Sequence, residues 1–185
     1  MSGLRIRKTL VYLTGFMGSG KSTIGPILAN TLGYNFADTD RVIEQRVGKS
    51  IKEIFLHDGE NLFRELERSV VGDLSKCNDY VVSLGGGSVV DPTVFGIVKD
   101  SGILVYLQSS PEHLLRRLQH KSDRPVLSDK EGQRLNIEQL RERVMQLYRA
   151  REPIYSQAHL IIHTDEKKVG VTVDEIAKRL VALLK

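Results

Sequence analysis

One eight-residue segment constrains this chain more than any other feature of its sequence. Residues 15–22 read Gly-Phe-Met-Gly-Ser-Gly-Lys-Ser, which matches the pattern G-x-x-x-x-G-K-[ST]. The apolar run Thr9–Leu13 precedes this segment and is expected to form a buried strand. A helix is expected to follow, from about Lys21 to Leu32. A strand, a glycine-rich loop and a helix in this order form a phosphate-binding loop, so the sequence predicts a site for a nucleoside triphosphate.

The residues of this loop suit an anionic ligand that carries a metal ion. Glycines let backbone N–H groups converge on a phosphate without obstruction by a Cβ atom. The start of the following helix adds the positive end of its dipole. We expect Lys21 to bridge the β and γ phosphates and the Ser22 hydroxyl to bind Mg²⁺. GTPase switches, motor ATPases and small-molecule kinases share such a loop, so the loop alone does not identify the reaction.

Strands and helices alternate along the whole chain, and the strands are continuously apolar. This pattern is typical of a parallel sheet that is covered by helices on both faces, which makes the fold class α/β. The expected strands are Thr9–Leu13, Tyr34–Ala37, Tyr80–Leu84, Ile103–Leu107 and Leu160–His163. Because neither an internal repeat nor an interdomain linker is found, residues 1–185 are expected to form a single domain.

Sequence patterns mark the ends of several helices. Gly33 is expected to end the first helix, and Ser50-Ile-Lys-Glu53 is a capping box. Asp91–Pro92 and Ser110–Pro111 each place a capping residue before a proline at the first helical position. Thr172-x-x-Glu175 is another capping box, which is expected to open the last helix.

Composition narrows the setting in which the protein works. Cys77 is the single cysteine, so no intramolecular disulfide can form, which favours a reducing compartment such as the cytoplasm. No apolar run is long enough to span a bilayer as a helix. The formal net charge is +4, with acidic and basic residues interspersed, so we expect neither a nucleic acid nor a membrane as partner. A monomer is expected.

Two carboxylates follow the second expected strand. Asp38 and Asp40 are two residues apart, so a strand would place both side chains on one face, at the edge where parallel sheets bind ligands. One of them is suited to hold Mg²⁺, and the other to orient a hydroxyl or take its proton during attack on the γ-phosphate. The alternative is structural, with Asp40 as the N-cap of a helix over Arg41–Val47 and Asp38 as a turn residue.

An arginine and a glycine triplet are further candidates for a ligand site. Arg64 lies in an expected helix over Asp58–Lys76, where pairing with Glu60 or Glu67 on a solvated face is the simpler interpretation. The triplet 85–87 directly follows a strand, where glycines allow a ligand to approach the backbone closely. An ordinary flexible turn is the alternative for the triplet.

The segment 120–136 is polar, lacks periodicity and is long for a loop, so a functional or mobile role is expected. Arg124 lies within it and could fold over a phosphoryl group in transfer. A helix is expected over Ile137–Ala150, and Pro153 predicts a break after it that would turn Arg151 inward. The histidines show no metal-binding pair in an H-E-x-x-H frame.

Taken together, these motifs resemble the shikimate kinase family. The segments that carry the resemblance occur in the family's order and span about residues 9 to 165; they are Gly15–Thr23, Phe36–Asp40, Gly48–Ile51, Ile54–Glu60, Phe63–Arg64, Val82–Gly87, Asp123–Leu127 and Arg151–Tyr155. The resemblance implies a three-layer α/β/α fold with a five-stranded parallel sheet of the P-loop kinase type. It also implies a substrate-binding region over about 34–64 and a mobile lid over about 120–136.

The resemblance further implies a reaction and a role for each matching residue. The reaction is transfer of the ATP γ-phosphate to the 3-hydroxyl of shikimate in aromatic amino-acid biosynthesis. Asp40 would face the shikimate hydroxyls as the candidate base, with Asp38 near the Mg²⁺ ion. The carboxylate of shikimate would be bound by Arg64 and Arg151, and its ring would lie against Gly86 and Gly87. The expected ATP contacts are Gly18, Ser19, Gly20, Lys21, Ser22, Thr23, Arg117 beside adenine, and Arg124 as the lid arginine.

Two other functions stay open at this point. A kinase for another small polyol acid or for a nucleoside monophosphate would differ only in the acceptor pocket. A nucleotide-dependent switch or binding module would need no acceptor, but it offers no use for the glycine triplet or for the pair of aspartates. The Asn-Lys-x-Asp pattern for guanine recognition is absent from the sequence.

Overall fold

Five parallel strands form the centre of the protein. The computed structural model describes residues 9–119 and 135–183. The strands lie side by side in the order β2-β3-β1-β4-β5, and every pairing between neighbours is parallel. Their bounds are β1 Leu10–Thr14, β2 Asn35–Asp38, β3 Tyr80–Ser83, β4 Ile103–Gln108 and β5 Leu160–His163. Each predicted strand is confirmed to within a residue at either end.

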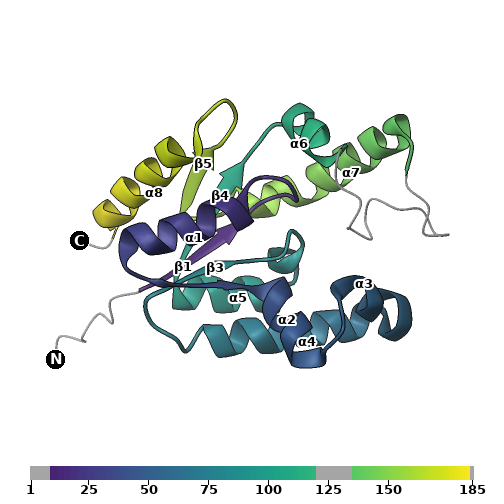
Figure 1. Ribbon diagram of the computed structural model, residues 1–185, viewed down its shortest axis with the longest axis horizontal. Helices are drawn as coiled ribbons and strands as arrows, with labels where there is room; N and C mark the ends of the chain where they lie inside the picture. Colours follow the sequence, from purple (N-terminus) through teal and green to yellow (C-terminus); the bar gives the residue numbers. More distant parts are fainter. Residues whose placement is uncertain (1–8, 120–134, 184–185) are drawn as a thin grey trace.

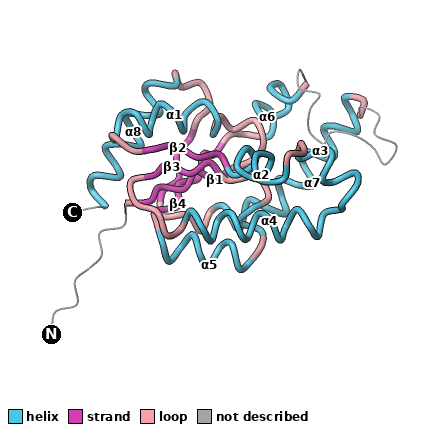
Figure 2. The backbone as a smooth tube through the Cα atoms, turned by 60° about the horizontal axis from the view of Figure 1, so that its bottom comes forward, coloured by secondary structure: helices cyan, strands magenta, loops and turns pink. Residues whose placement is uncertain are grey.

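Helices cover both faces of this sheet (Figure 1). The helices α1 and α8 lie on one face, and α4 and α5 lie on the other, as the rotated view of Figure 2 also shows. The bounds are α1 Lys21–Leu32, α2 Thr39–Val47, α3 Ile51–Glu53, α4 Gly59–Leu74, α5 Pro92–Ser101, α6 Pro111–Leu118, α7 Ile137–Tyr155 and α8 Val169–Leu183. A π-helical turn, η1 Ile54–Asp58, joins α3 to α4, and a 3₁₀ turn, η2 Ser88–Val90, precedes α5.

Both faces of the central strand β1 are buried, which explains its apolar sequence. Its alternate side chains enter two different cores. Val11 and Leu13 pack with residues of α1 and α8, whereas Leu10 and Tyr12 pack with residues of α5 and α7 on the opposite face. Because both faces are buried, the strand is apolar from Leu10 to Leu13, and Thr14 at its end is its one buried threonine. The predicted three-layer α/β/α architecture is therefore confirmed.

Most of the helix ends follow the predicted capping signals. Ser50 and Glu53 form the expected capping box, and the side chains of Asp91 and Ser110 accept backbone hydrogen bonds at the starts of α5 and α6. Gly33 ends α1 in a left-handed conformation, with φ of 70°.

Two predicted helix ends are wrong. The helix α8 begins at Val169, so Thr172 lies inside its first turn, where its hydroxyl donates to the carbonyl of Lys168 at 3.4 Å. The helix α7 continues through Pro153 to Tyr155. Pro153 lies near the end of the helix, where it removes one hydrogen bond, and burial of the Tyr155 side chain favours the last turn.

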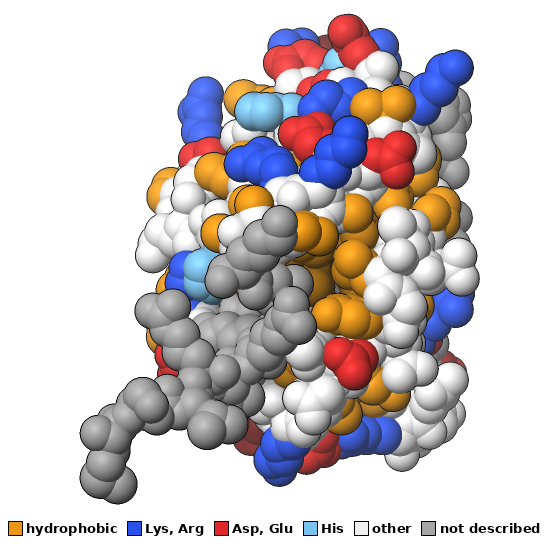
Figure 3. Space-filling view, turned by 90° about the vertical axis from the view of Figure 1, so that its left-hand side faces the viewer, with side chains coloured by type: hydrophobic (Ala, Val, Ile, Leu, Met, Phe, Trp, Pro, Cys, Tyr) orange, Lys and Arg blue, Asp and Glu red, His pale blue; other side chains and the backbone are white. Residues whose placement is uncertain are grey.

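Charges are mixed on the surface as well as along the sequence. The face shown in Figure 3 carries basic and acidic side chains next to one another at one end, with hydrophobic side chains visible between polar ones lower down. Among the described residues, no helix is long and apolar enough to cross a membrane.

Candidate active site

A cavity of about 370 Å³ opens at the carboxyl edge of the sheet. Its wall is built by the loops that follow β1, β2 and β3, by the end of α6, and by the connection from β5 to α8. The strand β1 has β3 on one side and β4 on the other, so the chain leaves β1 at the point where the strand order reverses. Parallel sheets bind ligands at such a point, and the volume is that of a small-molecule site.

The loop after β1 forms the floor of the cavity. Gly18 and Gly20 have φ values of 83° and 102°, which favour glycine, and Gly20 directly precedes α1. The buried Lys21 ammonium donates hydrogen bonds to the carbonyls of Gly15 at 2.7 Å and of Phe16 at 3.2 Å. Ser19 is also buried, and no described residue is a hydrogen-bond partner for its hydroxyl. A phosphate oxygen placed in this loop would give that hydroxyl an acceptor.

The two aspartates after β2 both line the cavity, but they are arranged differently from the prediction. Asp38 is the N-cap of α2, because its Oδ1 accepts hydrogen bonds from the amides of Asp40 at 3.1 Å and Arg41 at 3.3 Å. The alternative interpretation, with Asp40 as the cap, is therefore wrong. The strand ends at Asp38, so Asp40 lies in the first turn of α2 and not on a strand face. The Asp40 carboxylate therefore lies near the positive end of the α2 dipole.

The glycine triplet after β3 packs tightly against its surroundings. A Cβ atom on Gly85 would lie 3.1 Å from Asp40 Oδ1 and 3.2 Å from Glu67 Oε1, and one on Gly86 would lie 3.3 Å from the Met17 amide nitrogen. The triplet thus contacts the phosphate-binding loop, α2 and α4 at once. A Cβ atom at either position would make contacts tighter than most side chains in proteins have, which the interpretation as an ordinary flexible turn does not explain.

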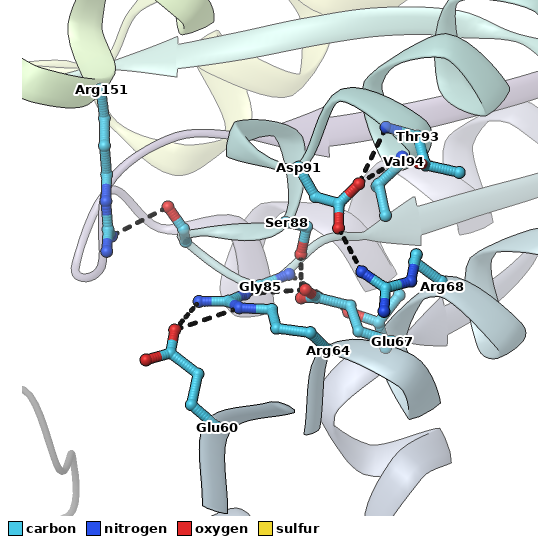
Figure 4. Close-up of polar contacts among 12 residues, drawn as sticks. Glu60, Arg64, Glu67, Arg68, Gly85, Ser88, Asp91, Thr93, Val94 and Arg151 are labelled. Carbon is cyan, nitrogen blue, oxygen red and sulfur yellow. Dashed lines mark hydrogen bonds and ion pairs between the residues drawn. The ribbon is translucent and has the colours of Figure 1, made fainter. Parts of the chain in front are cut away.

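Arg64 is held by two carboxylates of its own helix, which Figure 4 shows. Its guanidinium donates to Glu67 at 2.8 Å and to Glu60 at 3.0 Å. Glu67 is buried, and its second oxygen accepts a hydrogen bond from Ser88 at 2.5 Å. Burial lowers the pKa of Arg64, but Glu67 and Glu60 outweigh burial and raise this pKa above its ordinary value. The predicted pairing is confirmed, although Glu67 does not belong to a solvated face.

Arg151 approaches the triplet from the opposite side. Its Nη1 donates to the Gly86 carbonyl at 3.1 Å, as drawn in Figure 4. A Cβ atom on Gly87 would lie 3.2 Å from Arg64 Nη2 and 3.6 Å from Arg151 Nη2. Two guanidinium groups therefore converge on one glycine. Arg151 reaches it from a continuous helix and not from the predicted break. Arg64, Gly87 and Arg151 are not part of the cavity lining, but they adjoin it through Gly86, which is.

Comparison with known proteins decides the family. The family model described as shikimate kinase matches residues 17–185. This chain belongs to the shikimate kinase family. Among curated relatives, the shikimate kinase of Chlorobaculum parvum is 50% identical over 172 residues, which cover 93% of this chain and 92% of the relative. That of Chlorobaculum tepidum is 48% identical over 172 residues, covering 93% and 90%.

Solved structures of shikimate kinases share the fold. The enzyme from Acinetobacter baumannii in complex with shikimate has a TM-score of 0.85 and 31% identity, covering 94% of this chain and 93% of that chain. The enzyme from Bacteroides thetaiotaomicron has a TM-score of 0.84 and 32% identity, covering 93% and 98%. The predicted P-loop kinase fold, the predicted family and its class of ATP-dependent kinases are confirmed.

The remaining predicted residues of this shikimate kinase family member fall into two groups. Arg117 lines the cavity, and its Nη1 donates to the Gly18 carbonyl at 3.0 Å. The lining also contains 18–23 of the phosphate-binding loop. Arg124, with most of the predicted lid, lies outside the described residues. The predicted subdivision into a substrate-binding region and a lid stays a prediction.

Sequence reasoning missed several residues that shape this site. Thr164 and Lys167 line the cavity from the β5–α8 connection, and Val169 lines it from the first turn of α8. The sequence indicates Glu67 only as a surface partner of Arg64. Only its spacing of three residues from Arg64 indicated a contact, and spacing does not show that a carboxylate is buried.

The cavity contains oxygen donors that suit a magnesium ion. Ser22 and Asp38 both line it, and hydroxyl and carboxylate oxygens are hard ligands of the kind that Mg²⁺ prefers. Within residues 9–119 and 135–183, no cluster of three or more His, Cys, Asp or Glu side chains forms a metal cage. This donor set fits an ion that is bound chiefly through a substrate's phosphates, with few protein ligands.

Proposed function

We propose that this protein transfers the γ-phosphate of ATP to the 3-hydroxyl of shikimate, giving shikimate 3-phosphate and ADP, in aromatic amino-acid biosynthesis. One observation carries the proposal. A single cavity holds the phosphate-binding loop together with Asp40 and Gly86, and two arginines adjoin it at Gly87. This arrangement offers a place for a triphosphate, an acceptor for a hydroxyl, and a cationic clamp for a small anion.

The nucleotide would occupy the floor and one end of the cavity. The amides of Gly18, Gly20 and their neighbours are suited to the β and γ phosphates, and Lys21 would neutralise the charge that develops during transfer. Ser19 and Thr23 belong to the same contact set. Arg117 holds the outer side of the loop and would lie beside adenine, with Arg124 as the arginine that covers the phosphates.

Mg²⁺ would be held by Ser22 and, directly or through water, by Asp38. The ion would neutralise negative charge on the phosphate oxygens. Asp38 caps α2 with Oδ1, and its other oxygen gives it a second role without loss of the cap. One side chain would then serve both the start of α2 and the Mg²⁺ ion.

Shikimate would lie between the glycine triplet and α4. Its carboxylate would pair with Arg64 and Arg151, because planar guanidinium groups bind carboxylates through two parallel hydrogen bonds. The ring would lie against Gly86 and Gly87. Asp40 would accept a hydrogen bond from the reacting hydroxyl and orient it or take its proton. Phosphoryl transfer through a loose transition state depends mainly on such positioning.

The proposal includes the cellular compartment, the oligomeric state and the binding partners of the enzyme. The single Cys77 favours a reducing compartment, and we place the protein in the cytoplasm as a monomer that binds neither nucleic acid nor membranes. Sedimentation velocity at micromolar concentration tests the monomer. A dimer peak that persists on dilution would contradict it.

A coupled assay of ADP release tests the reaction. Purified protein with Mg-ATP is given shikimate, gluconate or AMP, and the phosphorylated product is measured by mass spectrometry. We expect stoichiometric shikimate phosphate and only background ADP release with the other two acceptors. Turnover with gluconate or with AMP, but not with shikimate, would favour a kinase for another small molecule. Nucleotide binding without any phosphorylated product would favour a switch or binding module.

A further inference from the structure

Tyr155 is a buried tyrosine that the roles proposed above do not use. It is the last residue of α7, and its side chain is 0% exposed. Its ring packs against Tyr106, with ring centroids 5.1 Å apart. Its hydroxyl donates a hydrogen bond to the carbonyl of Gly86, which lines the cavity. The ring thus belongs to the core, while the hydroxyl reaches the wall of the active site.

The Gly86 carbonyl accepts a second hydrogen bond from the same helix. Arg151 Nη1 donates to it at 3.1 Å. Arg151 and Tyr155 are four residues apart on α7, so their side chains leave the same face of the helix, one turn from each other. A carbonyl oxygen has two lone pairs, and these two donors occupy both. Two hydrogen bonds to this oxygen therefore link α7 to the glycine triplet.

The direction of this carbonyl determines the direction of the next amide. The described chain contains no cis peptide bonds, so the Gly87 N–H points away from the Gly86 carbonyl within one planar unit. The phosphate-binding loop lies close to Gly86 on the other side, since a Cβ atom on Gly86 would lie 3.3 Å from the Met17 amide nitrogen. A loss of the hydrogen bond from Tyr155 would release a peptide that touches both the phosphate-binding loop and Arg151.

We propose that Tyr155 is a positioning residue for the acceptor site, because its hydroxyl holds the Gly86–Gly87 peptide and the Arg151 guanidinium in one arrangement. The inference rests on the proposed function, which assigns these groups to shikimate. It predicts that the hydroxyl, apart from the ring, controls how well the enzyme uses its acceptor.

The hydroxyl is suited to this role over a wide pH range. Burial raises the pKa of Tyr155 to about 12, although the neighbouring Arg151 opposes this shift. The group therefore stays protonated and donates its hydrogen bond at every pH in which the enzyme is assayed. Its contribution does not titrate together with the carboxylates of the site.

The test compares Tyr155→Phe with Tyr106→Phe. Each variant removes one buried hydroxyl from the same aromatic cluster and keeps the ring. The Tyr106 hydroxyl has no hydrogen bond to the glycine triplet among the described residues. For Tyr155→Phe we expect kcat/KM for shikimate to fall by about ten-fold, with KM for ATP changed by less than about two-fold. For Tyr106→Phe we expect both parameters to stay within about two-fold of the unchanged protein.

Thermal unfolding, measured on the same samples, separates positioning from loss of fold. We expect both variants to unfold within a few degrees of the unchanged protein and of each other. Equal shikimate kinetics in Tyr155→Phe and the unchanged protein would overturn the inference and leave the proposed function intact. Equal losses in both variants would also overturn it, since that result indicates a purely structural effect. If the unchanged protein lacks shikimate-dependent turnover, the proposed function fails and this inference fails with it.

Discussion

Glu67 accepts a hydrogen bond from Arg64 at 2.8 Å while its own side chain is only 1% exposed. Glu60, the other partner of the same guanidinium, is 63% exposed. Arg64 therefore has one partner inside the protein and one in solvent. An ion pair in solvent contributes little and gives way easily, whereas a buried carboxylate cannot lose its partner without a large cost. Glu67 thus determines where the Arg64 side chain lies.

This difference predicts unequal effects of two matched substitutions. Glu67→Gln keeps the shape of the side chain and an oxygen for Ser88, but it removes the charge that holds Arg64. We expect KM for shikimate to rise by about ten-fold or more, with little change in KM for ATP. Glu60→Gln removes the same charge from the exposed partner, and we expect a change of less than about two-fold. Steady-state kinetics measures KM for shikimate in both variants. Similar rises in the two would contradict the claim that the buried Glu67 positions Arg64 more strongly than the exposed Glu60 does.

Lys21 provides a second prediction. Its buried ammonium lies at the phosphate-binding loop, so Lys21→Ala should lower kcat/KM by at least about 10³-fold, because the phosphate charge in the transition state is no longer neutralised. Lys76→Ala is the control, since Lys76 pairs with Asp73 at 3.5 Å, outside both the cavity lining and the predicted substrate-binding region. Single-turnover kinetics with labelled ATP checks the result. Activity retained in Lys21→Ala would refute the assignment of the loop.

Asp40 and Asp38 should differ in the kinetic parameter that each controls. Asp40→Asn is expected to lower kcat by about 10²-fold or more, since an amide cannot take a proton from the acceptor hydroxyl. An effect confined to KM would remove Asp40 as a base. Asp38→Asn keeps the cap of α2, because asparagine also caps helices, and it should instead raise the Mg²⁺ concentration needed for half-maximal rate. Titration of Mg²⁺ at saturating shikimate separates the two variants.

Asp91 should make stability depend on pH in the acid range. Burial raises the pKa of its carboxyl, but hydrogen bonds from Arg68 and from the Val94 and Thr93 amides outweigh burial and hold this pKa below its ordinary value. Ionised Asp91 therefore stabilises the fold at neutral pH. This contribution is complete above the pKa of the unfolded chain, near 4, and is lost as the pH falls through the lower pKa of the folded state.

Asp91→Asn tests this contribution because asparagine can still cap α5. We expect the free energy of unfolding at pH 7 to fall by about 0.5–1 kcal/mol, and the difference from the unchanged protein to shrink below about pH 4. Urea denaturation, monitored by circular dichroism at each pH, measures this difference in the free energy of unfolding. Asp73→Asn is the control, since Asp73 and its partner Arg46 are both largely exposed, and we expect a smaller change. A constant difference from pH 7 to pH 3 would contradict the linkage.

Local signals predicted much of the fold because they depend on neighbours in the chain. A capping box such as Ser50-Ile-Lys-Glu53 is complete within four residues, and the buried strand β1 is marked by its own apolar run. The predicted helix ends were wrong where other contacts of the helix outweighed a local signal. Thr172 and Glu175 have the spacing of a capping box, but α8 already begins at Val169. Pro153 should interrupt α7, but burial of Tyr155 favours one more turn.

The residues of the candidate site also divide into those that local sequence signals predict and those that they do not. The phosphate-binding loop, the two aspartates and the glycine triplet could be recognised from spacing, because each is a short segment at the end of a strand. Which aspartate caps α2 could not be predicted, because both have side chains that cap well and the choice depends on where β2 ends.

The sequence by itself determined a phosphate-binding loop between a strand and a helix, an alternating α/β order, and membership of the shikimate kinase family. Those properties follow from residue types and short spacings. Only the tertiary structure decided that Arg64 and Arg151, 87 positions apart in the sequence, converge on Gly87, and that Glu67 is buried behind them. Burial and convergence depend on how distant segments pack, and a sequence pattern with a range of a few residues does not contain that information.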